Sequence, residues 1–336
     1  MKFPAVAIVI GATALAAGFW AARRIEAEMP HLVEIGNDTS LRMHSEGRGR
    51  PTVILEFSAN EHLRHDIADF ARVVDYDRGG WGDSVTSAPG RDAGQIAREL
   101  HAALARAQLE PPYVLAGEGY GTLFVRAFAA LYPSEVRGLL LCDPLVEEER
   151  PEAVVDWLKK EQPESFAIFS ERLAVAGVQA SDLVGWLGYQ RASERRKMAL
   201  LVAGAPPGEK AVWSTLLEQQ LTVLESERET YSYITSLPGY EWKELVAFAR
   251  NFEQMRGQAA PADLPVRILT SMRVPNLSDP AAVNCLRAER KWVRGEREQL
   301  LKNYPRGSQT VSEISLGHIP AEDPNLLLTE LRKLCR

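Results

Sequence analysis

Cysteine is scarce in this sequence, and its distribution excludes two kinds of site. Cys142, Cys285 and Cys335 lie far apart and show no metal-ligand spacing. We therefore expect neither a disulfide framework nor a metal site, and no motif indicates an organic cofactor. Long basic runs are also absent and the net charge is −6 at pH 7, so nucleic acid is not an expected partner. The sequence shows no internal repeat or low-complexity segment, which excludes a repeat architecture.

The composition is that of a protein with an ordinary core. Of the 336 residues, 46% are hydrophobic and 25% are charged. Chains of this length form one large α/β domain with an insertion, or two domains.

The longest uncharged run lies at the N-terminus. Residues 3–22 carry no charge and stand between Lys2 and the pair Arg23-Arg24. About 20 apolar residues in a helix span the hydrocarbon core of a bilayer. We therefore predict a single-pass membrane anchor within residues 1–28. Residues 14–16 also resemble a signal-peptide cleavage site, so a secreted form after cleavage is the alternative. The flanking charges leave the side of the membrane open.

The rest of the chain alternates between buried strands and helices. A polar hairpin is expected over residues 31–45, strands over 51–57, 72–77, 112–116 and 136–142, and helices over 92–107 and 122–132. This order predicts an α/β fold with a mostly parallel, doubly wound sheet. The pattern becomes helical and charged over residues 146–260, which we interpret as an inserted lid. Strands at 264–270 and 309–315 and helices at 281–303 and 324–335 then complete the core. The predicted core therefore has two parts, residues 31–145 and 261–336.

The stretch Gly117–Gly121, with sequence GEGYG, follows a buried strand and precedes an apolar helix that Pro133 stops. It has the G-x-S-x-G spacing of a nucleophile elbow, a strained turn that raises a catalytic serine over the edge of a sheet. Gly119 stands at the serine position. Glycine tolerates the strained backbone at little cost, whereas a serine stores about 1–3 kcal/mol there. The sequence therefore predicts the shape of a catalytic turn without its nucleophile.

Four motifs together resemble the α/β-hydrolase fold family, in particular its branch of serine hydrolases related to prolyl iminopeptidases and esterases. Residues 76–84 (YDRGGWGDS) are similar to Y-D-R-x-G-x-G-x-S, and residues 112–121 (PYVLAGEGYG) to P-Y-V-L-x-G-H-S-x-G. Residues 136–144 resemble V-x-G-L-V-L-V-D-P. Gly317-His318 followed by Asp323-Pro324 resembles G-H-x-x-x-x-x-x-P. The resemblance covers about residues 31–145 and 262–335, and no motif covers the lid.

The resemblance implies roles for several residues. His318 matches the general base, and Asp143 matches a carboxylate that serves as the acid in some hydrolases. Asp279 is the nearest alternative at the more usual acid position. The backbone N–H of Tyr120 and the loop that contains Ser58 match the two oxyanion-hole donors.

The sequence departs from the family pattern in two places. Gly119 removes the attacking oxygen, and the glycine-rich oxyanion loop is reduced to Phe57–Asn60. Glu118 stands immediately before the nucleophile position, where we expect a structural role. Two departures in one site indicate relaxed selection for catalysis.

These features favour a membrane-anchored protein of the ester or amide hydrolase type that is impaired or inactive as a serine hydrolase. Such a pseudoenzyme would keep a pocket under the lid for a small apolar ester-like or amide-like ligand. The alternative is an active hydrolase, in which His318 activates a water molecule or Ser58 replaces the missing nucleophile.

Overall fold

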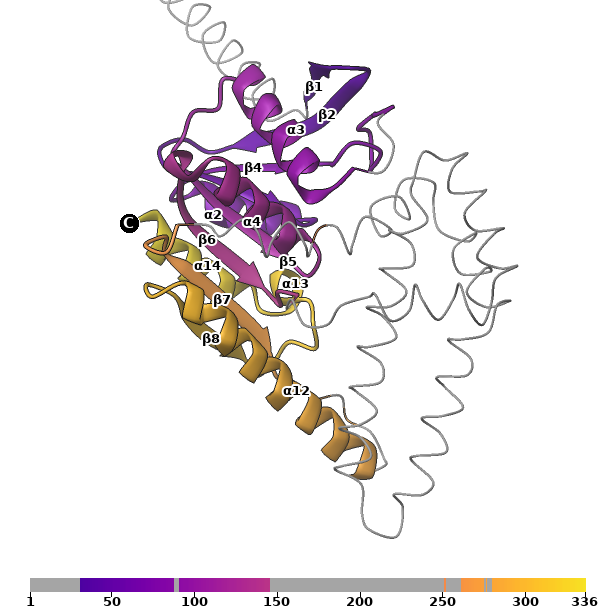
Figure 1. Ribbon diagram of the computed structural model, residues 1–336, viewed down its shortest axis with the longest axis vertical. Coiled ribbons are helices and arrows are strands. Elements are labelled where there is room, and N and C mark those ends of the chain that lie inside the picture. The colour runs from indigo at the N-terminus through magenta and orange to yellow at the C-terminus, as the bar shows by residue number, and fades with distance from the viewer. Residues whose placement is uncertain (1–30, 88–90, 146–250, 252–260, 275, 277–279) are drawn as a thin grey trace, which may run out of the picture.

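The computed structural model describes residues 31–87, 91–145, 251, 261–274, 276 and 280–336 (Figure 1). The predicted anchor and nearly all of the predicted lid lie outside these ranges, as does Asp279. Among the helices of the described ranges, none is both long and apolar enough to cross a membrane.

An eight-stranded sheet forms the centre of the molecule, in the order β1-β2-β4-β3-β5-β6-β7-β8. Its strands are β1 (His31–Gly36), β2 (Thr39–Glu46), β3 (Thr52–Glu56), β4 (Arg72–Tyr76), β5 (Tyr113–Glu118), β6 (Val136–Cys142), β7 (Val266–Ser271) and β8 (Ser308–Ser312). The pairs β1/β2 and β2/β4 are antiparallel. All the other neighbours are parallel. The predicted hairpin and the mostly parallel sheet are therefore confirmed.

Helices cover both faces of the sheet, as Figure 1 shows. They are α2 (Glu61–Ala68), α3 (Ala93–Arg106), α4 (Gly121–Leu131), α12 (Pro280–Leu300), α13 (Ile319–Glu322) and α14 (Pro324–Cys335), with short 3-10 turns η1 (Pro133–Glu135) and η2 (Leu301–Asn303). The helix predicted over residues 324–335 is present with the same bounds.

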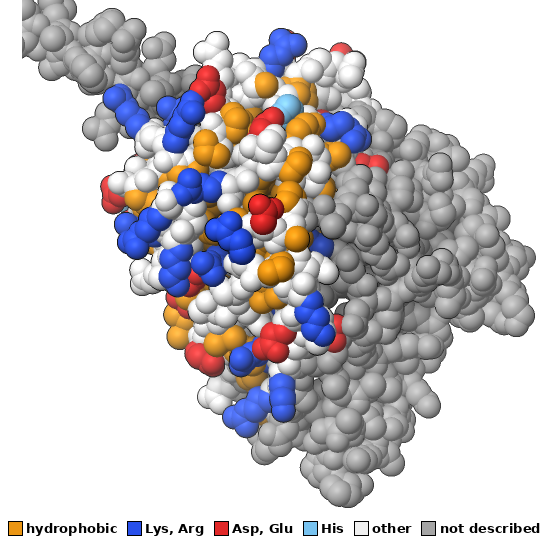
Figure 2. Space-filling model, turned by 60° about the vertical axis from the view of Figure 1, so that its left-hand side comes forward, with side chains coloured by type: hydrophobic (Ala, Val, Ile, Leu, Met, Phe, Trp, Pro, Cys, Tyr) orange, Lys and Arg blue, Asp and Glu red, His pale blue; other side chains and the backbone are white. Residues whose placement is uncertain are grey.

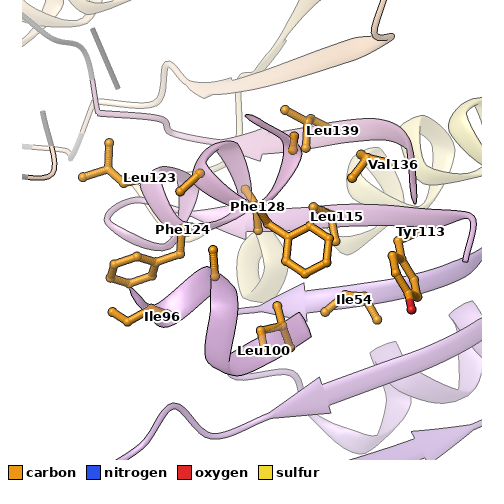
Figure 3. Close-up of a cluster of buried hydrophobic side chains, with 14 of the residues drawn as sticks. Ile54, Ile96, Leu100, Tyr113, Leu115, Leu123, Phe124, Phe128, Val136 and Leu139 are labelled. Atoms are coloured by element: carbon orange, nitrogen blue, oxygen red, sulfur yellow. The ribbon is translucent and has the colours of Figure 1, made fainter. Parts of the chain in front are cut away.

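Successive residues of the central strands point to opposite faces and so build two cores. Ile54 and Leu115 pack with α3 and α4 in one core (Figure 3). Val53 and Val114 pack with α2 and α14 in the other. This burial on both faces explains why the sequences of these strands are continuous apolar runs.

Local signals fix the ends of several helices. Asp92 accepts a hydrogen bond from the backbone N of Gln95 at 2.7 Å and caps α3. Asn60 caps α2 in the same way through Leu63. An N-cap of this type typically contributes about 1 kcal/mol. The helices that flank the sheet edge beside Gly119 therefore begin at defined positions.

Candidate active site at the elbow

The predicted elbow is present at the end of β5. Gly119 has φ +51°, in the left-handed region, which costs a residue with a side chain about 1–2 kcal/mol. Its N–H donates to the carbonyl of Cys142 at 2.9 Å, and its own carbonyl accepts from the Thr122 hydroxyl at 2.6 Å. A Cβ added at Gly119 would meet no atom of the described structure within 4 Å. Among the described residues, the turn therefore leaves open space at the position of the nucleophile.

The two flanking glycines have a different role, because their missing side chains permit close packing. A Cβ on Gly121 would lie 2.4 Å from the carbonyl oxygen of Glu56 in β3. A Cβ on Gly117 would lie 2.9 Å from the carbonyl oxygen of Gly121. Both distances are shorter than real Cβ contacts. The outer glycines of the motif therefore allow α4 to start directly against the sheet.

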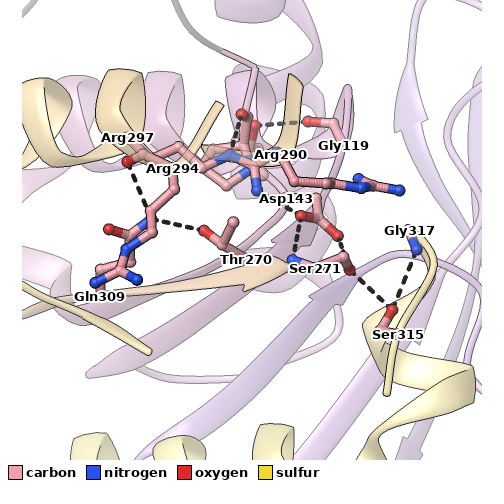
Figure 4. Close-up of polar contacts among 12 residues, drawn as sticks. Gly119, Asp143, Thr270, Ser271, Arg290, Arg294, Arg297, Gln309, Ser315 and Gly317 are labelled. Carbon is pink, nitrogen blue, oxygen red and sulfur yellow. Dashed lines mark hydrogen bonds and ion pairs between the residues drawn. The ribbon is translucent and has the colours of Figure 1, made fainter. Parts of the chain in front are cut away.

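Asp143 follows β6 at the same edge of the sheet, but its carboxylate binds other partners than His318. Oδ1 accepts from the backbone N of Ser271 at 2.9 Å and from Nη1 of Arg297 (Figure 4). Oδ2 accepts from the Ser271 hydroxyl at 2.6 Å. Among the described residues, no hydrogen bond or ion pair joins Asp143 to His318. Asp143 thus lies close to the predicted site, but its carboxylate is bound by residues of β7 and α12.

The ion pair of Asp143 with Arg297 is buried. The side chains are 11% and 8% exposed, and burial lowers the pKa of Arg297. Arg297 also donates to the carbonyl of Pro144 at 3.3 Å, so α12 holds the chain where the predicted lid begins.

His318 lies beside Glu118 instead. Its Nδ1 is 3.9 Å from Glu118 Oε1, and the imidazole is 79% exposed whereas the Glu118 side chain is 22% exposed. This distance exceeds a hydrogen bond. Glu118 Oε1 is itself buried and has no hydrogen-bond partner in the described part of the chain. Glu118, for which we expected a structural role, is the described carboxylate that pairs with the imidazole of His318.

Burial raises the pKa of Glu118 to about 7. The nearby charge of His318 opposes this shift, while Asp143 and Glu322 reinforce it. A carboxyl group of this kind exchanges its proton near neutral pH, which is the range in which a general acid or base operates.

The raised pKa predicts a specific dependence of stability on pH. Below pH 4.5 Glu118 is protonated in both the folded and the unfolded chain. Between pH 4.5 and about 7 the unfolded chain releases a proton that the folded chain keeps, so stability falls as pH rises. Glu118→Gln should remove this loss. Relative to wild type, the free energy of unfolding of the variant should therefore be higher at pH 8 than at pH 4.5 by about 1–2 kcal/mol, after allowance for the partial exposure of the side chain.

Urea unfolding of both proteins across this pH range measures the effect. Glu313→Gln, at an exposed glutamate, is the control and should leave the pH dependence unchanged. A Glu118→Gln protein that is less stable than wild type at pH 8 would contradict the prediction.

A row of polar contacts links Asp143 to the loop of His318. The hydroxyl oxygens of Ser271 and Ser315 are 2.8 Å apart (Figure 4). Ser315 donates to Glu322 Oε2 at 2.8 Å. The same Glu322 oxygen accepts from the backbone N of Leu316 at 2.6 Å and of His318 at 3.4 Å. Asp143 therefore reaches the His318 loop through two serines and not through the imidazole. No sequence motif indicated these serines.

Tyr120, whose N–H was predicted to be an oxyanion donor, is the residue before α4. Its hydroxyl accepts from Asn251 Nδ2 at 2.6 Å. Asn251 is buried, and its Oδ1 accepts from the backbone N of Ala93 at 2.6 Å. This residue of the predicted lid segment therefore joins the elbow to the start of α3.

Ser58 is exposed in the short connection between β3 and α2. The end of β3 before it carries Glu56, which is buried. Tyr76 and Arg78 of the YDR motif both donate to the Glu56 carboxylate. This motif therefore holds the edge of the sheet beside the shortened loop. Across the described ranges, no group of three or more His, Cys, Asp or Glu side chains could hold a metal ion.

Comparison with known proteins gives few matches by sequence. No protein-family model matches the chain. An uncharacterized protein of Bacillus subtilis, YqjL, is 30% identical over 107 residues. That match covers 30% of this chain and 42% of the length of YqjL.

Comparison by structure is more extensive. An esterase from Thermogutta terrifontis matches with a TM-score of 0.53 and 18% identity, over 92% of this chain and all of its own. A probable hydrolytic enzyme from Pseudomonas aeruginosa matches with a TM-score of 0.52 and 18% identity, over 92% and 95% of the two chains. Mouse alpha/beta hydrolase domain-containing protein 10 matches with a TM-score of 0.51 and 13% identity, over 91% and 98%. Together with the mostly parallel sheet and the elbow, these likenesses show that the fold of this chain is the α/β-hydrolase fold.

Proposed function

We propose that this chain is a membrane-anchored α/β-hydrolase-fold protein that has lost serine-hydrolase activity and keeps a ligand site. The observation that carries the proposal is the elbow itself. Gly119 occupies the nucleophile position with φ +51°, and within the described structure a Cβ there would point into open space. The site thus keeps the backbone geometry of a nucleophile without an attacking oxygen.

The rest of the site supports the same conclusion. The Asp143 carboxylate is bound by Ser271 and Arg297, so it does not orient the imidazole of His318. An enzyme that loses a catalytic triad keeps only about 10³–10⁴-fold catalysis over water. Each missing oxyanion-hole donor raises the activation barrier by a further 2.7–4 kcal/mol, roughly. The loop at Ser58 is short and the Ser58 side chain is exposed, so we propose that this residual activity is also reduced.

The ligand that we propose is a small apolar ester or amide, bound without turnover beside Gly119. Open α/β sheets bind ligands at the carboxyl ends of their strands, which is where Gly119, Asp143 and Glu118 lie. The esterase among the structural neighbours supports this chemical class.

We predict that fluorophosphonate probes do not label the wild-type protein and that it hydrolyses short-chain esters feebly at most. Gly119→Ser should add only slight turnover, because the loop at residues 57–60 and the engaged Asp143 remain. Intact-mass analysis and ester assays of wild type, Gly119→Ser and Gly119→Ala measure this, with the alanine variant as the control for a side chain without the hydroxyl. Stoichiometric labelling of wild type at any residue would refute the proposal, and labelling at Ser58 would identify that serine as a substitute nucleophile.

The second candidate function is a serine-free hydrolase in which His318 activates water. The contact between His318 and Glu118 at 3.9 Å favours it, because a buried carboxylate near an imidazole can share its proton. In that case wild type would hydrolyse esters at ordinary enzymatic rates, and His318→Ala would abolish the activity.

We also propose that residues 3–22 anchor the protein in a membrane. The uncharged run between Lys2 and Arg23-Arg24 supports this. We predict that alkaline carbonate leaves the full-length chain in the membrane pellet. A chain that starts at Glu28 is the matched control and should remain in the supernatant. Release of the full-length protein by carbonate, or a mature N-terminus near Ala17, would contradict the anchor and favour the cleaved, secreted form.

A further inference from the structure

The edge of the sheet opposite Gly119 is rich in basic side chains. The parallel strands start at this edge, and α2, α3 and α14 end there. We call it the basic edge. Its basic residues are Arg48, Arg50, Arg72, Arg106, Arg137, Arg267, Lys302, Arg306, Arg332, Lys333 and Arg336. Its acidic residues are Glu46, Asp69, Glu110, Glu135, Asp263 and Glu330. Figure 2 shows Lys and Arg side chains spread across the face that is turned forward, with fewer Asp and Glu side chains among them.

Four of the six acidic residues of this edge form ion pairs. Glu46 pairs with His65, Glu110 with Arg50, Glu135 with His101, and Glu330 with Lys333 at 2.6 Å. Several of the basic residues have no such partner. In the described part of the chain, no ion pair involves Arg48, Arg72, Arg106, Lys302 or Arg336, and all of these except Arg72 are exposed.

This excess of positive charge runs against the composition of the chain, whose net charge is −6. A surface that serves solubility alone carries both signs interspersed. Positive charge that is collected on one face of an acidic protein instead attracts an anionic partner.

We infer that the basic edge lies against the anionic phospholipid headgroups of a membrane. The direction of β1 favours this partner over a free polyanion. Because β1 is antiparallel to β2, and β2 to β4, β1 runs in the same direction as the parallel strands. The chain therefore enters β1 from the side of the basic edge, and His31 is seven positions after Arg24, the second arginine that follows the uncharged run. The inference goes beyond the proposed function and uses the proposed anchor only to choose the partner.

Arginine footprinting of the full-length chain tests this inference. The protein is placed in nanodiscs of neutral phosphatidylcholine, or of the same lipid with about a third phosphatidylserine. It is then modified with phenylglyoxal and mapped by mass spectrometry. Each basic residue near an anionic surface gains about 1 kcal/mol, so Arg48, Arg106 and Arg336 should react about fivefold more slowly in the anionic discs. The exposed residues Arg273 and Arg287 are internal controls on the other side of the fold and should react equally in both.

Repeating the footprinting at high salt distinguishes electrostatic protection of the arginines from steric crowding by the lipid. At 1 M salt the Debye length is about 3 Å, so the protection should disappear. Equal rates in both discs, or equal slowing at Arg273 and Arg287, would overturn the inference. Protection by duplex DNA without protection by anionic lipid would identify a nucleic-acid surface instead and would also overturn it.

The anchor and the basic edge can fail separately. If carbonate releases the full-length chain, the same footprinting with anionic vesicles added in solution still measures whether the arginines of the basic edge are protected. If the chain is anchored and no arginine is protected, the edge inference alone is wrong.

Discussion

Arg297→Met should lower the free energy of unfolding by about 3–5 kcal/mol, because it leaves the Asp143 carboxylate buried and without its cation. The two side chains are only 8% and 11% exposed. Methionine keeps most of the volume of the arginine side chain. The decrease in the free energy of unfolding therefore comes from the removed charge and not from a cavity. Denaturant unfolding at neutral pH measures it.

The same helix supplies a matched control. Arg294 pairs with Glu298 one turn later at 3.2 Å, with both side chains about half exposed. Exposed pairs of this spacing contribute about 0.3–0.5 kcal/mol, so Arg294→Met should change stability very little. Adding Asp143→Asn to Arg297→Met should recover part of the loss, because it removes the unpaired charge. Equal effects of the two single arginine variants would show that Asp143 and Arg297 are not a buried pair.

Alanine substitutions at Gly121 and Gly119 should separate the two uses of glycine in the elbow. The Cβ of Gly121→Ala would lie 2.4 Å from the Glu56 carbonyl oxygen. Neither the backbone of β3 nor that of α4 can yield without moving an element of the core, so the expected loss is about 3 kcal/mol or more. The Cβ of Gly119→Ala meets open space among the described residues, and its cost is the left-handed backbone alone, about 1–2 kcal/mol.

Thermal and urea unfolding of the two alanine variants compare these losses directly. Wild-type stability for Gly121→Ala would mean that α4 does not start against β3 as described. A larger loss for Gly119→Ala than for Gly121→Ala would mean that the space above the elbow is filled. Gly119→Ser should behave like Gly119→Ala in stability, which makes the activity test of the restored serine interpretable.

Much of the fold could be predicted from the sequence, because its determinants are local. The strand before the elbow, the elbow itself and the following helix form one continuous stretch of apolar and glycine residues. The capping side chain of Asp92 stands next to the helix that it starts. Where hydrophobic pattern, turn residues and caps agree, the element follows from the sequence alone.

The partners within the site could not be predicted, because they come from distant parts of the chain. Arg297 and Asp143 are 154 positions apart, and Ser271 and Asp143 are 128 apart. Spacing along the sequence carries no information about such pairs. From its place beside Gly119, Glu118 is predicted to have a structural role. Its contact with His318 depends on where the loop after β8 returns to the edge of the sheet.

The row of oxygens from Asp143 through Ser271 and Ser315 to Glu322 has a consequence for its hydrogen atoms. The row contains three short oxygen–oxygen contacts, but two hydroxyl groups supply only two hydrogens. With both carboxylates ionised, Ser315 gives its hydrogen to Glu322, and Ser271 has one hydrogen for two neighbours. Ser271 therefore donates to Asp143 or to Ser315 but not to both at once, so two hydrogen bonds, and not three, run along this row at any moment between the core and the loop that carries His318.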